Sequence, residues 1–233
     1  MKLHFLGTGG AFARTHTNAW FEEPREDGRR DLYLLDLSML HVQAAETLVR
    51  EETGEIYVLL THMHDDHCSG IGLFIEWCLL LKGRIVNILV QEALAQDVRD
   101  YLRIIGVPEE MYRLITFSVQ MEMAGVTVTA IPTRHTPALA GKCFGFCLET
   151  GGQRVVFTGD TATLEPFIPW LTEGAELYTE MAYHHGNVHL RWEEQKTLLL
   201  PLAKKCSVFL MHMDDEEALR RETEGTGIRL VTL

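Results

Sequence analysis

The sequence predicts an α/β fold in which two packed, mixed β-sheets carry helices on the outside. Short apolar segments of strand composition alternate with amphipathic helical segments along the 233 residues. The stretch from Gly125 to Thr158 contains consecutive strands separated by glycine and proline, so the sheets cannot be wholly parallel. No linker or internal repeat divides the chain. We therefore expect a single domain over residues 1–233.

The individual elements follow from hydrophobic periodicity and from the positions of glycine and proline. The predicted strands are Lys2–Leu6, Leu32–Asp36, Ile56–Leu60, Ile85–Val90, Val126–Ile131, Phe144–Glu149, Arg154–Phe157, Leu177–Glu180, Val208–Met211 and Ile228–Thr232. The predicted helices are Met39–Glu51, Ile71–Leu81, Ala93–Ile105, Leu164–Leu171 and Arg191–Lys204, and Asp214–Glu224 is expected to be an exposed helix. Ser38 is a candidate N-cap, and Pro201 is expected to end or kink its helix.

Composition excludes several classes of protein. A formal net charge of −12 without a block of lysine or arginine disfavours a large RNA partner. No apolar segment is long enough to span a membrane, and no signal-peptide pattern opens the chain, so we expect a cytoplasmic protein. Five cysteines without a Cys-x-x-Cys pair predict reduced thiols rather than disulfides. The oligomeric state is not determined by the sequence, which allows a homodimer.

Potential metal ligands are concentrated directly after one predicted strand. The apolar segment Ile56–Leu60 is followed by Thr-His-Met-His-Asp-Asp-His, which places His62, His64, Asp66 and His67 at the carboxyl end of a buried strand. Functional sites of open α/β sheets usually lie at that end. Chance clustering of solvated histidines is the alternative interpretation of this segment taken alone.

Three later segments repeat the pattern of a strand followed by a ligand. His135, Asp160 and His212 each come after an apolar strand. Each has an ordinary explanation on its own: a loop histidine, a helix cap and a half-buried histidine. Together they favour one site, because the ends of all these strands are expected to converge on the same edge.

In these segments the sequence resembles the metallo-β-lactamase fold superfamily of metal hydrolases. The resemblance covers nearly the whole chain and implies an αββα sandwich of two mixed sheets. It also implies that His62, His64 and His135 hold one metal ion, that Asp66, His67 and His212 hold a second, and that Asp160 bridges the two. Asp65 is left to solvent or to a supporting role, and the spacing does not make Cys68 a ligand.

The ligand types agree with a pair of divalent ions. Imidazole suits zinc, and a carboxylate can bridge two ions. Paired ions about 3.5–4 Å apart lower the pKa of a bridging water, so that a bridging hydroxide becomes the nucleophile. We expect zinc, with manganese or iron as alternatives that the same ligands accept.

Further motifs resemble the branch that contains ribonuclease Z and the cyclic phosphodiesterases of phosphonate metabolism. These are Phe-Leu-Gly-Thr-Gly-Gly-Ala-Phe at residues 5–12 and the segment from His135 to Thr161. An aspartate rather than a cysteine in Gly-Asp-Thr, His64 in place of a glutamate, and the full ligand set count against β-lactamases, flavodiiron proteins and single-metal persulfide dioxygenases. The short interval from Asp160 to His189 leaves no room for the arm that ribonuclease Z uses to bind tRNA. The resemblance therefore favours a small, cyclic phosphodiester as substrate.

This branch also has a histidine that protonates the leaving oxygen. His189 is our choice for this general acid, with Glu180 as its orienting partner, although His184 and His185 lie nearby. The branch has Ser-Thr after this histidine, whereas Leu190 and Arg191 stand here. A solvated residue at a helix start is the alternative interpretation of His189.

The sequence thus predicts a binuclear metal-dependent phosphodiesterase. A thioester or lactone hydrolase of the glyoxalase II or lactonase type, using the same metals on a carbonyl, is the alternative. A third hypothesis is a metal or nucleotide binder without activity, which the complete set of ligands disfavours.

Overall fold

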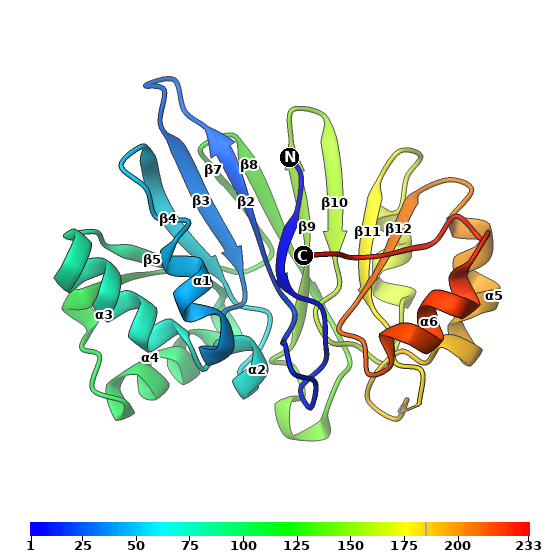
Figure 1. The fold of residues 1–233 in the computed structure, drawn as a ribbon. Helices are drawn as coiled ribbons and strands as arrows, with labels where there is room; N and C mark the ends of the chain where they lie inside the picture. The colour runs from blue at the N-terminus through cyan, green and yellow to red at the C-terminus, as the bar shows by residue number, and fades with distance from the viewer. Residues whose placement is uncertain (185) are drawn as a thin grey trace. The chain divides into compact units, whose positions relative to one another are not determined.

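The computed structural model describes residues 1–184 and 186–233. It divides into two compact units, each containing one β-sheet. Unit 1 comprises Met1–Gly7, Thr15–Ser118 and Leu233, and unit 2 comprises Thr8–Arg14 and Val119–Thr232. Whether the units form the single domain expected from the sequence stays a prediction, and each is described by itself (Figure 1).

Unit 1 is built on a sheet in the order β1-β2-β3-β4-β5-β6. Its strands are β1 His4–Gly7, β2 Asn18–Pro24, β3 Arg30–Leu35, β4 Thr53–Leu59, β5 Val86–Gln91 and β6 Tyr112–Phe117. The first three strands pair antiparallel and β3 to β6 pair parallel, so the sheet is mixed. Val58 pairs with Leu34 on one side and with Ile88 on the other. These residues are fully buried, as expected for central parallel strands.

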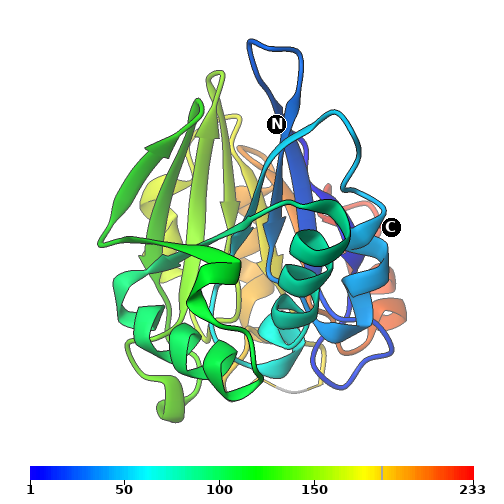
Figure 2. The same cartoon turned by 90° about the vertical axis from the view of Figure 1, so that its left-hand side faces the viewer.

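The helices of unit 1 follow its parallel strands. They are η1 Met39–His41, α1 Val42–Glu46, α2 Asp65–Cys68, α3 Ile71–Lys82, η2 Glu92–Leu94, α4 Ala95–Ile104 and η3 Glu109–Met111. Figures 1 and 2 show α3 and α4 along the same side of the sheet. The short α2 holds part of the predicted ligand cluster and follows β4 directly. The carboxyl ends of β3 and β4 share one edge, because the two strands are parallel.

Unit 2 is built on a sheet in the order β13-β12-β11-β10-β9-β8-β7. Its strands are β7 Gln120–Met123, β8 Val126–Pro132, β9 Phe144–Thr150, β10 Gln153–Phe157, β11 Glu176–Glu180, β12 Ser207–Met211 and β13 Arg229–Leu230. Strands β7 to β10 pair antiparallel, and β10 to β13 pair parallel. Since β9 is antiparallel to both β8 and β10, the strands β8, β10, β11 and β12 all end at the same edge.

The helices of unit 2 are η4 Pro137–Leu139, η5 Glu165–Trp170, α5 Trp192–Leu202 and α6 Glu216–Thr223. In Figure 1, α5 and α6 lie beside β12. Asp215 caps α6 by accepting a hydrogen bond from the Ala218 N–H at 2.9 Å, which agrees with the predicted exposed helix. Pro201 lies in the last turn of α5, one residue before its end.

The predicted strands are all present, with shifted ends, and the mixed character of the sheets is confirmed. Three strands were missed: β2, β6 and β7. Each carries charged or polar residues among its apolar ones, which hides the strand pattern. The predicted helix Leu164–Leu171 is wrong, because the segment forms a 3₁₀ helix. Pro166 and Pro169 have no amide hydrogen for an α-helical ladder.

The predicted helix Met39–Glu51 is also shorter in the structure, where α1 ends at Glu46 after the 3₁₀ turn η1. Ser38 takes the N-cap position without a side-chain hydrogen bond. Among the described residues, no helix combines the length and apolar character needed to cross a membrane.

Candidate metal centre

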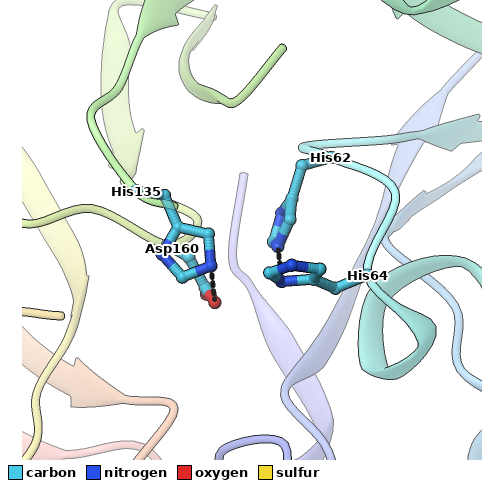
Figure 3. Close-up of side chains that lie close together, drawn as sticks. All are labelled: His62, His64, His135 and Asp160. Atoms are coloured by element: carbon cyan, nitrogen blue, oxygen red, sulfur yellow. Dashed lines mark hydrogen bonds and ion pairs between the residues drawn. The ribbon is translucent and has the colours of Figure 1, made fainter. Parts of the chain in front are cut away.

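In unit 1, the histidine-rich turn after β4 forms a compact cluster of ligand atoms. The Nε2 atom of His62 lies 3.0 Å from the Nδ1 atom of His64, as the dashed line between them in Figure 3 marks. The rings of His62 and His67 lie 4.1 Å apart, and His67 Nε2 lies 3.2 Å from an oxygen of Asp66. His62, Asp66 and His67 are buried and His64 is half-buried, whereas Asp65 is exposed.

A buried carboxylate that the sequence analysis missed supports this turn. Asp36 follows β3 and has a left-handed backbone with φ of 59°, which aspartate tolerates better than most residues. One oxygen accepts a hydrogen bond from the Thr61 N–H at 2.8 Å. The other accepts one from the Thr61 hydroxyl at 2.8 Å and lies 2.8 Å from His67 Nδ1. The sequence signal was an aspartate at the end of the predicted strand Leu32–Asp36.

The environment of Asp36 decides which ring nitrogens remain for a ligand. Burial raises the pKa of its carboxyl, while His67 and the hydrogen bonds from Thr61 act in the opposite direction. An ionised Asp36 accepts a hydrogen from His67 Nδ1, so the lone pair of His67 lies on Nε2. The Thr61 hydroxyl, which donates to Asp36, accepts from His62 Nδ1 at 2.9 Å. His62 thereby also presents a lone pair on Nε2.

In unit 2, three predicted ligands and the predicted orienting residue Glu180 come from the edge that four strands share. His135 follows β8, Asp160 follows β10, Glu180 ends β11 and His212 follows β12. One carboxylate oxygen of Asp160 lies 3.6 Å from His135 Nε2, and the other lies 3.5 Å from His212 Nε2. Figure 3 shows the first of these pairs. The buried carboxylate therefore lies between two imidazoles, one toward each oxygen.

The second nitrogen of His135 is held by the backbone. Its Nδ1 lies 2.9 Å from the carbonyl oxygen of Val188, which can only accept a hydrogen bond. The hydrogen is therefore on Nδ1, and Nε2 carries the lone pair toward Asp160. His212 has a left-handed backbone with φ of 52°, so its position at the end of β12 is conformationally specific.

His189 and Glu180 form a hydrogen-bonded pair in the same unit. His189 Nδ1 lies 2.7 Å from one oxygen of the fully buried Glu180. The other oxygen accepts a hydrogen bond from the Thr161 N–H. His189 is half-buried, and its Nδ1 lies 3.9 Å from Asp160. His184 is exposed and pairs instead with Asp215 at 3.0 Å, and His185 lies outside the described residues.

The donor atoms fit a divalent metal ion. His62, His67 and His135 each direct Nδ1 to an oxygen and leave Nε2 for a ligand, which is the usual arrangement around metal-binding histidines. In unit 2, Asp160, His189 and His212 offer ligand atoms within 4.8 Å of one another, so His189 is also a candidate ligand. Burial raises the pKa of the Cys68 thiol to about 12, which disfavours thiolate ligation there.

Solved structures identify the class of fold. The metallo-β-lactamase fold protein YhfI from Bacillus subtilis aligns with a TM-score of 0.75 and 18% identity, covering 99% of this chain and 95% of that one. Zinc-bound PqqB from Methylobacterium extorquens aligns with a TM-score of 0.74 and 16% identity, covering 99% and 97%. A diphosphatase from the PhnP family aligns with a TM-score of 0.67 and 16% identity, covering 98% and 94%. The chain has the metallo-β-lactamase fold, which confirms the predicted αββα class.

The sequence identifies the family within this class. The family model described as "Anti-Pycsar protein Apyc1" matches residues 1–232, so the chain belongs to that family. Anti-Pycsar protein Apyc1 of Bacillus phage 010DV004 is 22% identical over 92% of this chain and 90% of its own length. A ribonuclease Z from Mycobacterium sp. (strain KMS) is 28% identical over 75% of this chain and 64% of its own length. The resemblance to the ribonuclease Z branch is thus confirmed.

Proposed function

We propose that the protein is a binuclear metal-dependent phosphodiesterase that hydrolyses a small, cyclic phosphodiester, with a cyclic nucleotide as the model substrate. The observation that carries the proposal is Asp160, a buried carboxylate with one imidazole nitrogen toward each of its oxygens. A carboxylate that bridges two cations needs this arrangement, because each oxygen then shares an ion with a different histidine.

The proposal assigns the ligands of both units to one centre. His62, His64 and His135 take one ion, Asp66, His67 and His212 take the other, and Asp160 bridges them. We expect zinc, because imidazole is the main ligand and a relative of the same fold is zinc-bound. When bound, the ions supply Lewis acidity toward a phosphoryl oxygen and lower the pKa of a water toward neutrality.

The residues of unit 2 supply the remaining proton chemistry. Glu180 accepts the Nδ1 hydrogen of His189 at 2.7 Å, so in the imidazolium form the second hydrogen, on Nε2, is the one available for transfer. His189 lines a pocket with His212, which places it beside a space that a substrate can occupy. We assign His189 as the proton donor to the leaving oxygen, which is a poor leaving group as an alkoxide. Glu180 acts through His189 as a positioning residue.

Charge and relationship support a small phosphorus ester. The net charge of −12 opposes binding of a long polyanion and is tolerated by a mononucleotide. The ribonuclease Z and PhnP-family diphosphatase relatives carry names of phosphorus-ester chemistry, and membership of the anti-Pycsar family fits degradation of a cyclic nucleotide. These relationships favour phosphorus over the carbonyl of a thioester or lactone.

A panel of substrates tests the proposal. Purified protein loaded with zinc, manganese or iron is assayed on 3′,5′-cyclic nucleotides, bis(4-nitrophenyl) phosphate, a thioester and a lactone, with metal content measured beside activity. We expect turnover of the phosphodiesters at about two ions per chain. Cleavage of the thioester or lactone alone would assign a glyoxalase-like or lactonase-like activity. Bound metal without cleavage of any ester would assign a binding protein.

A further inference from the structure

We infer that unit 2 contains a subsite for the nucleobase of the substrate, with the Phe12 ring as its stacking surface. This inference rests on the proposed function, since it names the part of a cyclic nucleotide that lies beyond the phosphodiester. It begins from a cavity of about 310 Å³ that His189 and His212 line on one side. The cavity thus adjoins the residues assigned above to proton transfer and metal binding.

The rest of the cavity wall is mostly apolar. Ala11, Phe12, Ala13, Ala182 and Met213 contribute its apolar part, and His184 and Asp214 add polar groups at the same wall. A cyclic nucleotide has an anionic phosphodiester and a flat, uncharged base. The histidines suit the first part and the apolar wall suits the second. The volume lies near the lower end of the range of about 300–1,000 Å³ for ligand pockets, which suits a mononucleotide.

Among the residues of this wall, Phe12 is the one whose exposure a bound ligand would best explain. Its side chain is fully exposed, although it lines the cavity. An exposed phenylalanine gains no burial free energy until something covers its ring. Aromatic rings that stack on bases are common in nucleotide-binding sites, because every base has a π-face.

The backbone holds Phe12 in a defined place. The Gly10 N–H donates to the Met213 carbonyl at 3.0 Å, and the Met213 N–H donates to the Thr8 carbonyl at 3.0 Å. The Ala13 N–H donates to the Gly10 carbonyl at 2.9 Å, which closes a turn around Phe12. A Cβ atom on Gly10 would lie 3.3 Å from the His212 ring, so the loop lies directly on a proposed metal ligand. The backbone at Phe12 is therefore held before a ligand binds, so that only the ring itself has to be ordered on binding.

Binding to the metal-free protein tests the subsite without any catalysis. Calorimetry compares a nucleoside 5′-monophosphate with ribose 5-phosphate, which lacks the base, on the parent protein and on Phe12→Ala, Phe12→Leu and Phe12→Tyr. We expect Phe12→Ala to weaken nucleotide binding about tenfold and ribose phosphate binding less than about twofold. We expect Phe12→Tyr to keep the affinity of the parent protein and Phe12→Leu to keep only part of it. Val119→Ala, which removes an exposed apolar side chain of unit 2 outside the cavity, serves as the matched control.

A second measurement follows the same difference in turnover. For metal-loaded protein, Phe12→Ala lowers the ratio of kcat/KM for a cyclic nucleotide to kcat/KM for the corresponding cyclic ribose phosphate by about tenfold. An unchanged ratio together with unchanged nucleotide binding overturns the subsite, even if the protein is a phosphodiesterase. Phe12-dependent nucleotide binding by a protein that hydrolyses no phosphodiester overturns the proposed function and leaves the subsite standing.

One further outcome separates the subsite from a contact between two copies of the chain. The molar mass in solution is measured for the parent protein and for Phe12→Ala. A lower mass for the variant, with nucleotide binding unchanged, would assign Phe12 to an interface and overturn the inference. An unchanged mass with weakened nucleotide binding supports it.

Discussion

The two units hold their proposed ligands in different ways. In unit 1 the proposed ligands lie within one turn, from His62 to His67, and the buried carboxylate of Asp36 orients two of them, His67 directly and His62 through Thr61. In unit 2 they are scattered along the chain and meet only because β8, β10 and β12 end at one edge. A short motif is therefore enough to build the first cluster, whereas the second depends on strand order and direction.

The difference predicts that Asp160 is the most sensitive position in the molecule. Asp160→Ala removes the proposed bridge, so it is expected to lower phosphodiester turnover by at least about a thousandfold and to reduce bound metal below one ion per chain. His64→Ala, which removes a half-buried proposed ligand of one ion, is expected to lower turnover and metal content less. Turnover and metal content by emission spectrometry check both variants.

A matched control for Asp160 comes from the acidic pair of unit 1. Asp65 is exposed beside the proposed ligand Asp66, so Asp65→Ala is expected to keep the activity and the metal content of the parent. If Asp160→Ala behaves like Asp65→Ala, the bridge is wrong and with it the binuclear assignment. Thermal unfolding of both variants shows whether either substitution acts through stability.

The next effect concerns the histidine that we assign to proton transfer. His189→Ala is expected to lower turnover of a cyclic nucleotide about a hundredfold and that of bis(4-nitrophenyl) phosphate only slightly, since the second leaving group needs no proton. His4→Ala is the comparison, because His4 is exposed, stacks on Trp20 and does not line the cavity that His189 lines. We expect this variant to change the turnover of both substrates by the same factor.

The result for His189 also decides its second candidate role. Asp160, His189 and His212 lie close enough to share an ion. Loss of metal from His189→Ala, with equal losses on both substrates, would make His189 a ligand and leave the proton donor to be found elsewhere. Retained metal with a selective loss supports the general acid.

The two buried carboxylates are expected to have different roles: Asp36 supports metal binding, and Glu180 supports proton transfer. Asp36→Asn keeps a residue that tolerates the positive φ but weakens the hold on His67, so metal affinity is expected to fall about 10- to 100-fold. Glu180→Gln is expected to leave metal affinity within about threefold and to lower turnover of poor leaving groups about tenfold. Metal titration and leaving-group dependence are measured on both. Reversed effects would exchange the two roles.

The sequence alone was enough to predict the fold class and to propose the ligands, but it did not identify the residues that hold those ligands in place. The ligand turn was visible because His62, His64, Asp66 and His67 are adjacent in sequence. Asp36 was not recognised, because a lone aspartate after an apolar strand has no motif and its partners are set by the parallel pairing of β3 with β4. The helix predicted over Leu164–Leu171 is a 3₁₀ helix at Glu165–Trp170, because the apolar spacing is that of a helix but Pro166 and Pro169 prevent an α-helical hydrogen-bond pattern.

The smallest expected effect concerns whether the two units unfold together, and it does not involve the proposed reaction. Burial raises the pKa of the Cys78 thiol in unit 1 and of the Cys147 thiol in unit 2 to about 12. At pH 8 only on the order of one thiol in ten thousand is then ionised, so neither cysteine is expected to react with a thiol reagent in the native protein. In rising urea, peptide mass spectrometry follows the labelling of each. If the chain unfolds as one cooperative unit, both cysteines become exposed at one midpoint. If Cys78 and Cys147 react at separate midpoints, the two units fold independently, and the clusters of ligands then belong to two domains rather than one.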